Sequence, residues 1–351
     1  MNRIAKLIVT GVIGGGAAVE PLDPNLSLWG ERRTTNAAVY LVSNSVGAGA
    51  WATDPATTGW FQKLMAALKT KYGDGGSFVA GWNDLVGVNE RTLWTLGTGW
   101  DYHTSAIHEG VQNTGGVGAA VISLTGRYYD IYSYAGLATG AFHVSFDGGA
   151  NETVGADGGE FRHVKTTFDK ATSAARSLSL TLVSNWVFCN GIAARSGTGL
   201  FGINSSKSGA TLEAPGSWVG LPFLSMLSVL QPAITIISHG INECHNNTDP
   251  AVFQSNLEAW VDAIGANSSV LITSQNPINE TNAYPLTDYV DVCASVAAAK
   301  GCAYLDIYEL MGGSWAAALA SGYVTAGDPL HPTQAGHDLI YQSVYDMLTA
   351  G

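Results

Sequence analysis

An aspartate and a histidine near the end of the chain carry side chains suited to acid–base chemistry. They lie three residues apart in the segment Asp328-Pro329-Leu330-His331-Pro332. Each proline fixes its own φ angle and disfavours a helical conformation in the residue before it, so neither Asp328 nor His331 is expected inside a helix. A histidine can act as a general base, and a neighbouring carboxylate can orient its ring. The pair therefore predicts proton-transfer chemistry that still needs a nucleophile.

Two polar residues far upstream supply what the pair lacks. Ser45 follows an apolar run at 37–42 and lies in a turn of small residues, which should expose its hydroxyl for attack. Asn242 follows another apolar run and offers a side-chain amide for a developing negative charge. A hydroxyl, an imidazole, a carboxylate and an oxyanion donor are the groups that acyl transfer to water requires.

The four groups fall in short blocks that resemble those of the SGNH hydrolases, the GDSL esterase family. Residues 43–49 resemble Gly-Asp-Ser-x-x-x-Gly, and residues 204–211 resemble Asn-x-x-x-x-Gly-Ala/Asp-Thr. Residues 240–243 are similar to Gly-x-Asn-Asp, and residues 328–332 match Asp-x-x-His-Pro in full. The resemblance implies the catalytic residues Ser45, Asp328 and His331, and an oxyanion hole formed by Ser45, Gly209 and Asn242.

Three residues depart from the family pattern. Ser43 stands for the glycine and Asn44 for the aspartate of the first block, and Glu243 stands for the aspartate of the third. Ser43 is also an alternative nucleophile, although the spacing to Gly49 favours Ser45. The departures leave open a second hypothesis, in which the hydrolase domain is degenerate and the protein has a structural or receptor-binding role.

Strands alternate with helices over most of the chain, which predicts a parallel sheet covered on both faces. The family resemblance implies the same architecture, a flavodoxin-like three-layer α/β/α fold. This hydrolase domain is expected at 37–84 and 204–351. In such sheets reactive residues gather at the carboxyl ends of the strands, where all four groups would meet.

The segment 85–203 has a different pattern. Short alternating runs are separated by Gly/Asp/Asn turns, and helical periodicity is absent. This pattern predicts an inserted β-sandwich that resembles jelly rolls and is a candidate for carbohydrate binding. Trp94, Trp100 and Trp186, with Trp82 at the border, would then form either a sugar-stacking platform or the core of the sandwich.

Residues 1–36 precede the first predicted strand. A basic start and a glycine-diluted apolar stretch have the outline of a signal peptide, or of an arm that docks on a neighbour. The second interpretation resembles the N-terminal arms of bacteriophage minor tail proteins. It places the protein in a virion, with other tail proteins as partners, whereas the first places it outside the cell.

Composition narrows the choice of partners. The chain has 16 basic and 28 acidic residues and a formal net charge of -12, so it lacks the basic footprint expected for binding nucleic acid. No apolar run reaches the roughly 18 residues of a membrane span. His239 and His245 have no third ligand at fitting spacing, so no metal or other cofactor is expected.

The expected function is that of a serine esterase that removes a short acyl group, such as O-acetyl, from a carbohydrate or cell-envelope glycan. The alternative is a tail component with a degenerate hydrolase domain. A virion carrying an active esterase would combine the two.

Overall fold

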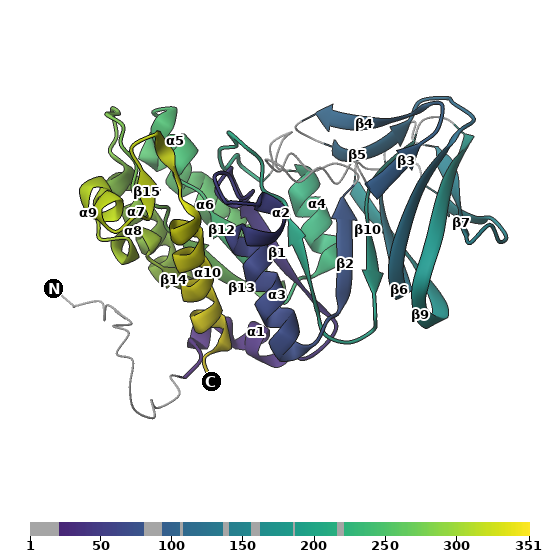
Figure 1. The fold of residues 1–351 in the computed structure, drawn as a ribbon, viewed down its shortest axis with the longest axis horizontal. Helices are drawn as coiled ribbons and strands as arrows, with labels where there is room; N and C mark the ends of the chain where they lie inside the picture. Colours follow the sequence, from purple (N-terminus) through teal and green to yellow (C-terminus); the bar gives the residue numbers. More distant parts are fainter. Residues whose placement is uncertain are drawn as a thin grey trace.

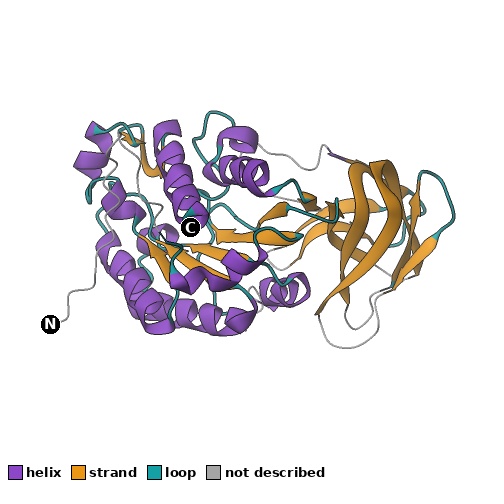
Figure 2. Ribbon diagram, turned by 90° about the horizontal axis from the view of Figure 1, so that it is seen from below, coloured by secondary structure: helices purple, strands orange, loops and turns teal. Residues whose placement is uncertain are grey.

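The structure is a computed structural model that describes residues 21–80, 93–105, 108–135, 140–155, 162–184, 187–215 and 221–351. Two large sheets dominate it, one parallel and one antiparallel, and they lie next to each other along the long axis of the molecule (Figure 1). The parallel sheet is embedded among helices, whereas the antiparallel sheet forms the other end of the molecule (Figure 2). The mixed architecture predicted from the sequence is thus confirmed.

The parallel sheet has five strands in the order β11-β1-β12-β13-β14. In sequence order this is 2-1-3-4-5, the flavodoxin-like arrangement. Its strands are mostly short apolar runs buried on both faces, as parallel sheets require. They are β1 (Ala37–Ser43), β11 (Leu200–Asn204), β12 (Ile234–Ser238), β13 (Ser269–Thr273) and β14 (Ala303–Leu305).

Helices cover both faces of this sheet (Figure 2). The helices α3 (Trp60–Tyr72) and α10 (Gln334–Thr349) pack against each other, as do α6 (Pro250–Ile264) and α7 (Leu286–Lys300). Each turns an apolar stripe to the core. The shorter helices are α2 (Pro55–Thr58), α4 (Leu221–Leu230), α5 (Ile241–His245), η3 (Gly265–Asn267), α8 (Ile307–Leu310) and α9 (Trp315–Ala320).

The antiparallel sheet has nine strands. The long strands β6 and β9 pair with each other and with further strands on either side, so the expected two-sheet sandwich is one continuous sheet with its own hydrophobic core. The strands are β2 (Gly76–Ala80), β3 (Trp94–Leu96), β4 (Trp100–Ser105), β5 (His108–Asn113), β6 (Ala119–Ala135), β7 (Ala141–Phe146), β8 (Glu152–Gly155), β9 (Arg162–Ser184) and β10 (Val187–Arg195).

The tryptophans of this sheet were candidates for a sugar-stacking platform. Trp94 and Trp100 are buried in its core, and the Trp100 indole N–H donates to the carbonyl of Gly118. Both therefore have the core role that was the alternative interpretation. Trp82 and Trp186 lie outside the described residues.

The boundaries between the two sheets differ from those expected at 84 and 203. Strand β2 pairs with β10 in the antiparallel sheet, and β11 pairs with β1 in the parallel sheet. An ion pair between the half-buried Arg195 and the buried Asp130 lies near the junction, and Arg195 also donates to Asn36 just before β1. The sequence missed these positions because β2 and β11 are short and both sheets use alternating or apolar runs of similar length.

Part of the expected N-terminal arm belongs to the parallel-sheet domain. Residues 1–20 lie outside the described residues, but η1 (Pro24–Leu26) and α1 (Ser27–Arg32) pack on the parallel-sheet domain. The indole N–H of Trp29 donates to the carbonyl of Leu348, and Arg33 donates to the last carbonyls of the chain. The last third of the segment 1–36 is therefore bonded to the C-terminal helix and is part of the folded domain.

The part of the chain that the structure describes contains no helix long and apolar enough to cross a membrane. Over the same residues, no three His, Cys, Asp or Glu side chains converge as a metal site would need. The cysteines Cys189, Cys244, Cys293 and Cys302 are all buried free thiols.

Candidate active site

The carboxyl ends of the parallel strands meet at one edge of the sheet, and the predicted site residues lie there. Ser45 follows β1, Gly209 lies in the loop after β11, and Asn242 follows β12. The strand β16 (Asp328–Pro332), which pairs with β15 (Val324–Thr325), adds Asp328 and His331 to this edge. The structure thus brings together five residues that are spread over most of the chain.

Ser45 lies in a tight turn directly after β1. Its carbonyl accepts the N–H of Ala50 at 2.9 Å, and the Asn44 side chain accepts the N–H of Val46 at 3.0 Å. A β-carbon on Gly47 would lie 2.4 Å from the Ser206 hydroxyl, so only glycine fits at this position. The turn directs the Ser45 hydroxyl to His331, with 2.9 Å between Oγ and Nε2.

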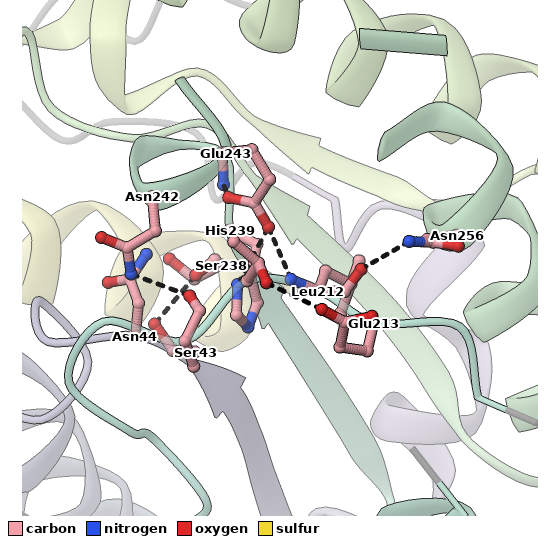
Figure 3. A network of polar contacts seen from close by, with 12 residues as sticks. Ser43, Asn44, Leu212, Glu213, Ser238, His239, Asn242, Glu243 and Asn256 are labelled. Carbon is pink, nitrogen blue, oxygen red and sulfur yellow. Dashed lines mark hydrogen bonds and ion pairs between the residues drawn. The ribbon is translucent and has the colours of Figure 1, made fainter. Parts of the chain in front are cut away.

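The two departures in the first block have hydrogen-bonded partners (Figure 3). Ser43 is buried, and its hydroxyl donates to the carbonyl of Ser238 at 2.9 Å. Asn44 is fully buried and donates to Gln275, whose amide in turn donates to Ser238 Oγ. Because Ser43 is bonded to β12, the hydroxyl that meets the histidine is that of Ser45.

His331 and Asp328 form a compact unit within β16. Nδ1 of His331 lies 2.9 Å from Oδ2 of Asp328. The other carboxylate oxygen accepts the backbone N–H groups of Leu330 and His331 at 2.7 and 2.9 Å. A carboxylate at Nδ1 selects the tautomer with its proton there, which leaves Nε2 free to accept the proton of Ser45.

These contacts also set the charge of Asp328. Burial alone would raise the pKa of this carboxyl, but the His331 ring and the backbone N–H groups of Leu330 and His331 outweigh it, and the pKa is lowered from its ordinary value. The carboxylate is therefore ionised at neutral pH. In that form it can hold the imidazole in place and stabilise its positive charge when it takes up a proton.

Asn242 is the second residue of α5, in a turn that begins at Gly240. Gly240 has a φ of 126°, which an L side chain rarely adopts. One N–H of the Asn242 amide donates to the carbonyl of Ala210 at 2.8 Å. The amide has a second N–H, and Ala210 directly follows Gly209, so the contact brings these two predicted oxyanion donors together.

Glu243, the departure in the third block, joins two loops of the site (Figure 3). Its carboxylate is buried and accepts the N–H of Gly240 at 2.8 Å and the N–H of Leu212 at 2.6 Å. Nδ1 of His239 lies 3.6 Å from the same carboxylate. Burial would raise the pKa of Glu243, but His239 and the backbone donors lower it instead. Glu243 therefore fixes the loop after β11 against the turn that carries Asn242.

The sequence assigned no role to several supporting residues, although one of them, Asn204, begins the second motif block. Asn276 follows β13 and donates to the carbonyl of Leu330 at 2.9 Å, next to His331. Asn204 at the end of β11 donates to the carbonyl of Gly47 at 2.9 Å. His337 is buried in α10 and donates from Nε2 to the carbonyl of Ala50 at 2.8 Å. The signal available for the first two was a polar residue at the carboxyl end of a buried parallel strand.

One protein-family model matches part of the chain. The model of the GDSL-like lipase/acylhydrolase family matches residues 185–339, a segment that includes Asn242, Asp328 and His331 but not Ser45. No curated protein sequence matches the chain.

One solved structure resembles almost the whole chain. It is described as a peptidoglycan O-acetylesterase in action, with a TM-score of 0.67 and 19% identity, and the match covers 92% of this chain and 93% of that one. More distant matches include the YXIM protein of Bacillus subtilis (TM-score 0.38, 14% identity, 70% and 85% covered). Another is an acetylxylan esterase of Geobacillus stearothermophilus (TM-score 0.36, 15% identity, 44% and 74% covered).

The α/β part of the chain has the flavodoxin-like sheet and the arrangement at the sheet edge that are typical of SGNH hydrolases, a class of serine esterases. Within it, residues 185–339 match the model of the GDSL-like lipase/acylhydrolase family.

Proposed function

We propose that the protein is an O-acetylesterase acting on a carbohydrate of a cell envelope, such as peptidoglycan, with Ser45 as its nucleophile. One observation carries the proposal: the uninterrupted series from Ser45 Oγ to His331 Nε2 and from His331 Nδ1 to Asp328, with 2.9 Å at each contact. Such a series is the minimal apparatus for deprotonating a serine hydroxyl.

The reaction proceeds in two halves. Ser45 Oγ attacks the ester carbonyl carbon while His331 Nε2 takes the hydroxyl proton. The oxyanion receives hydrogen bonds from the Asn242 side chain and from the backbone N–H groups of Ser45 and Gly209. The C–O bond to the sugar then breaks, and the leaving oxygen takes the proton from His331. A water molecule, deprotonated by His331, attacks the carbonyl carbon of the acetyl-enzyme. The bond from that carbon to Ser45 Oγ then breaks, Oγ takes the proton back from His331, and acetate is released.

The carbohydrate substrate is supported by the match over both sheets. The structure described as a peptidoglycan O-acetylesterase covers 92% of this chain, so it shares the antiparallel sheet as well as the hydrolase domain. At 19% identity the shared feature is the fold, and the substrate is our inference from it. An acetyl group suits a site whose nucleophile is only 6% exposed.

The first test asks which serine reacts. A fluorophosphonate probe should label the wild type and should not label Ser45→Ala. Ser43→Ala is the matched control, because Ser43 lies two residues away but donates to Ser238; it should still be labelled. Ser45→Ala should also release no acetate from O-acetylated peptidoglycan while its melting curve stays close to that of the wild type. Full labelling or turnover in Ser45→Ala would overturn the assignment.

A second set of variants tests whether the Asn242 side chain stabilises the oxyanion. Asn242→Ala should lower kcat by about 10²–10³, the usual loss for one oxyanion donor. Asn256→Ala is the control, since Asn256 donates to the carbonyl of Leu212 in the neighbouring loop and touches no predicted reacting group. A similar loss in both variants would show that loop packing, and not charge stabilisation, explains the effect.

The alternative of a degenerate, structural domain was motivated by Ser43, Asn44 and Glu243. Each of these side chains has a hydrogen-bonded partner that supports the site, so the departures do not argue against activity. Association with a phage tail, and location in a virion or outside the cell, rested on residues 1–36 and stay predictions.

A further inference from the structure

Trp51 differs from the other tryptophans of the described residues. Its side chain is 52% exposed, whereas most of the others lie in the two cores or against them. It is placed six residues after Ser45, in the same run of turns. An exposed indole on the segment that carries the nucleophile needs an explanation, because it adds little to the hydrophobic core.

The backbone turns this indole outward. Trp51 has a φ of 66°, in the left-handed region that bulky residues seldom adopt. Its neighbours Ala50 and Ala52 are both buried. Glycine or asparagine would adopt this conformation more easily. The chain therefore holds a large aromatic residue in a conformation that its type disfavours, which is a feature of functional positions.

Hydrogen bonds on both sides hold the turn. The N–H of Ala50 donates to the carbonyl of Ser45, and the carbonyl of Ala50 accepts from His337. On the other side, the N–H of Thr53 donates to Gln334 at 2.8 Å. Gln334 and His337 belong to α10, which begins directly after β16 and His331. The backbone at Trp51 is thus fixed relative to both the nucleophile and the base.

We propose that Trp51 is a substrate-binding residue, on whose indole face a sugar ring of the acetylated glycan stacks. This inference rests on the proposed function. When the ester carbonyl lies at Ser45, the rest of the glycan must extend past the neighbouring turn, which carries Trp51, the exposed aromatic side chain among the residues whose burial the structure describes. A flat apolar ring system with one N–H suits a pyranose, which has an apolar C–H face and polar edges. A small aryl ester has no sugar to place there.

The test compares two substrates in three variants. Trp51→Asn removes the ring but keeps a residue that tolerates the left-handed backbone. It should lower kcat/KM for O-acetylated peptidoglycan roughly tenfold, equivalent to about 1.4 kcal/mol, mainly through KM. Its kcat/KM for p-nitrophenyl acetate should stay within about twofold. Trp51→Tyr should recover most of the loss, and Val252→Ala, at an equally exposed apolar residue on α6, should have no effect.

The outcomes separate the two proposals. Equal losses on both substrates would mean that Trp51 acts through the turn, and no loss on either would mean that no sugar stacks there; both overturn the inference while the esterase assignment stands. If the wild type cleaves p-nitrophenyl acetate but releases no acetate from the glycan, the proposed substrate is wrong and the stacking site is wrong with it. If Ser45→Ala keeps full activity, the proposed function itself fails.

Discussion

The first and last turns of the site position their reacting groups in different ways. In the last turn, the Asp328 carboxylate bonds the His331 ring and two backbone N–H groups, all within three residues. In the first turn, residues 43–49, local bonds such as that from the Ala50 N–H to the Ser45 carbonyl are joined by contacts from elsewhere in the chain. Ser43 donates to Ser238, and the carbonyl of Gly47 accepts from Asn204. His331 is therefore held mainly by contacts within its own turn, whereas the turn of Ser45 depends more on distant strands.

This difference explains why one turn matches the family pattern and the other departs from it. The Asp328–His331 turn tolerates few substitutions, because the contacts of its carboxylate all depend on the three-residue spacing. A turn held by β11, β12 and α10 can change residues if its distant partners change too. The match to the family model covers residues 185–339, which include the last turn but not the first; most of the antiparallel sheet separates the first turn from the matched segment.

The largest expected effect tests the local character of the last turn. Asp328→Asn should lower kcat by about 10⁴-fold, because an amide no longer selects the reactive tautomer of the histidine or stabilises its positive charge. The amide oxygen can still accept the N–H groups of Leu330 and His331, so the melting temperature should change little. Turnover of an acetyl ester and thermal unfolding are measured together. Asp249→Asn, at the N-cap of α6, is the control and should remain active.

If Asp328→Asn instead unfolds the protein, the Asp328 carboxylate supports more of the structure than its own turn. The proposed difference between the two turns would then be wrong. Loss of activity without loss of stability would confirm that the turn's geometry depends on short-range contacts.

The distinction between local and distant contacts also determines which features the sequence could predict. The parallel strands, the main helices and the Asp328–His331 pair follow from local patterns, and Ser45 and Asn242 follow from motif spacing. Asn276 and His337 could not be found in this way, because their partners are set by which loops meet in space. The same reason accounts for the misplaced domain boundaries and for the assignment of Trp29 to the N-terminal segment outside the domain.

The second-largest expected effect concerns His337, which connects the two turns. His337 lies in the helix after His331 and bonds the carbonyl of Ala50 beside the Ser45 turn. Burial lowers the pKa of its imidazole to about 4, although the bond to Ala50 opposes this shift. The unfolded chain takes up this proton near pH 6.5, whereas the folded protein does not until about pH 4. Stability should therefore fall as pH decreases from about 6.5 to 4, by roughly 3 kcal/mol.

His337→Gln removes this titration while an amide N–H can still donate to Ala50. Denaturant unfolding at pH 7 and pH 4.5 should show a smaller loss of stability in the variant than in the wild type. Equal losses would mean that other groups, such as the carboxylates, cause the acid sensitivity.

The smallest expected effect tests the distant support of the first turn. Asn204 donates to the carbonyl of Gly47 at 2.9 Å and accepts the N–H of Ser206 at 3.0 Å. Asn204→Ala removes both bonds, and Asn204→Asp keeps an acceptor for Ser206 but loses the donor to Gly47. If the contact across the strands positions Ser45, both variants should lower kcat roughly tenfold, equivalent to about 1.4 kcal/mol. If the local bond to Ser206 matters more, only Asn204→Ala should do so. Turnover within twofold of the wild type in both variants would show that neither hydrogen bond of Asn204 is needed to position Ser45.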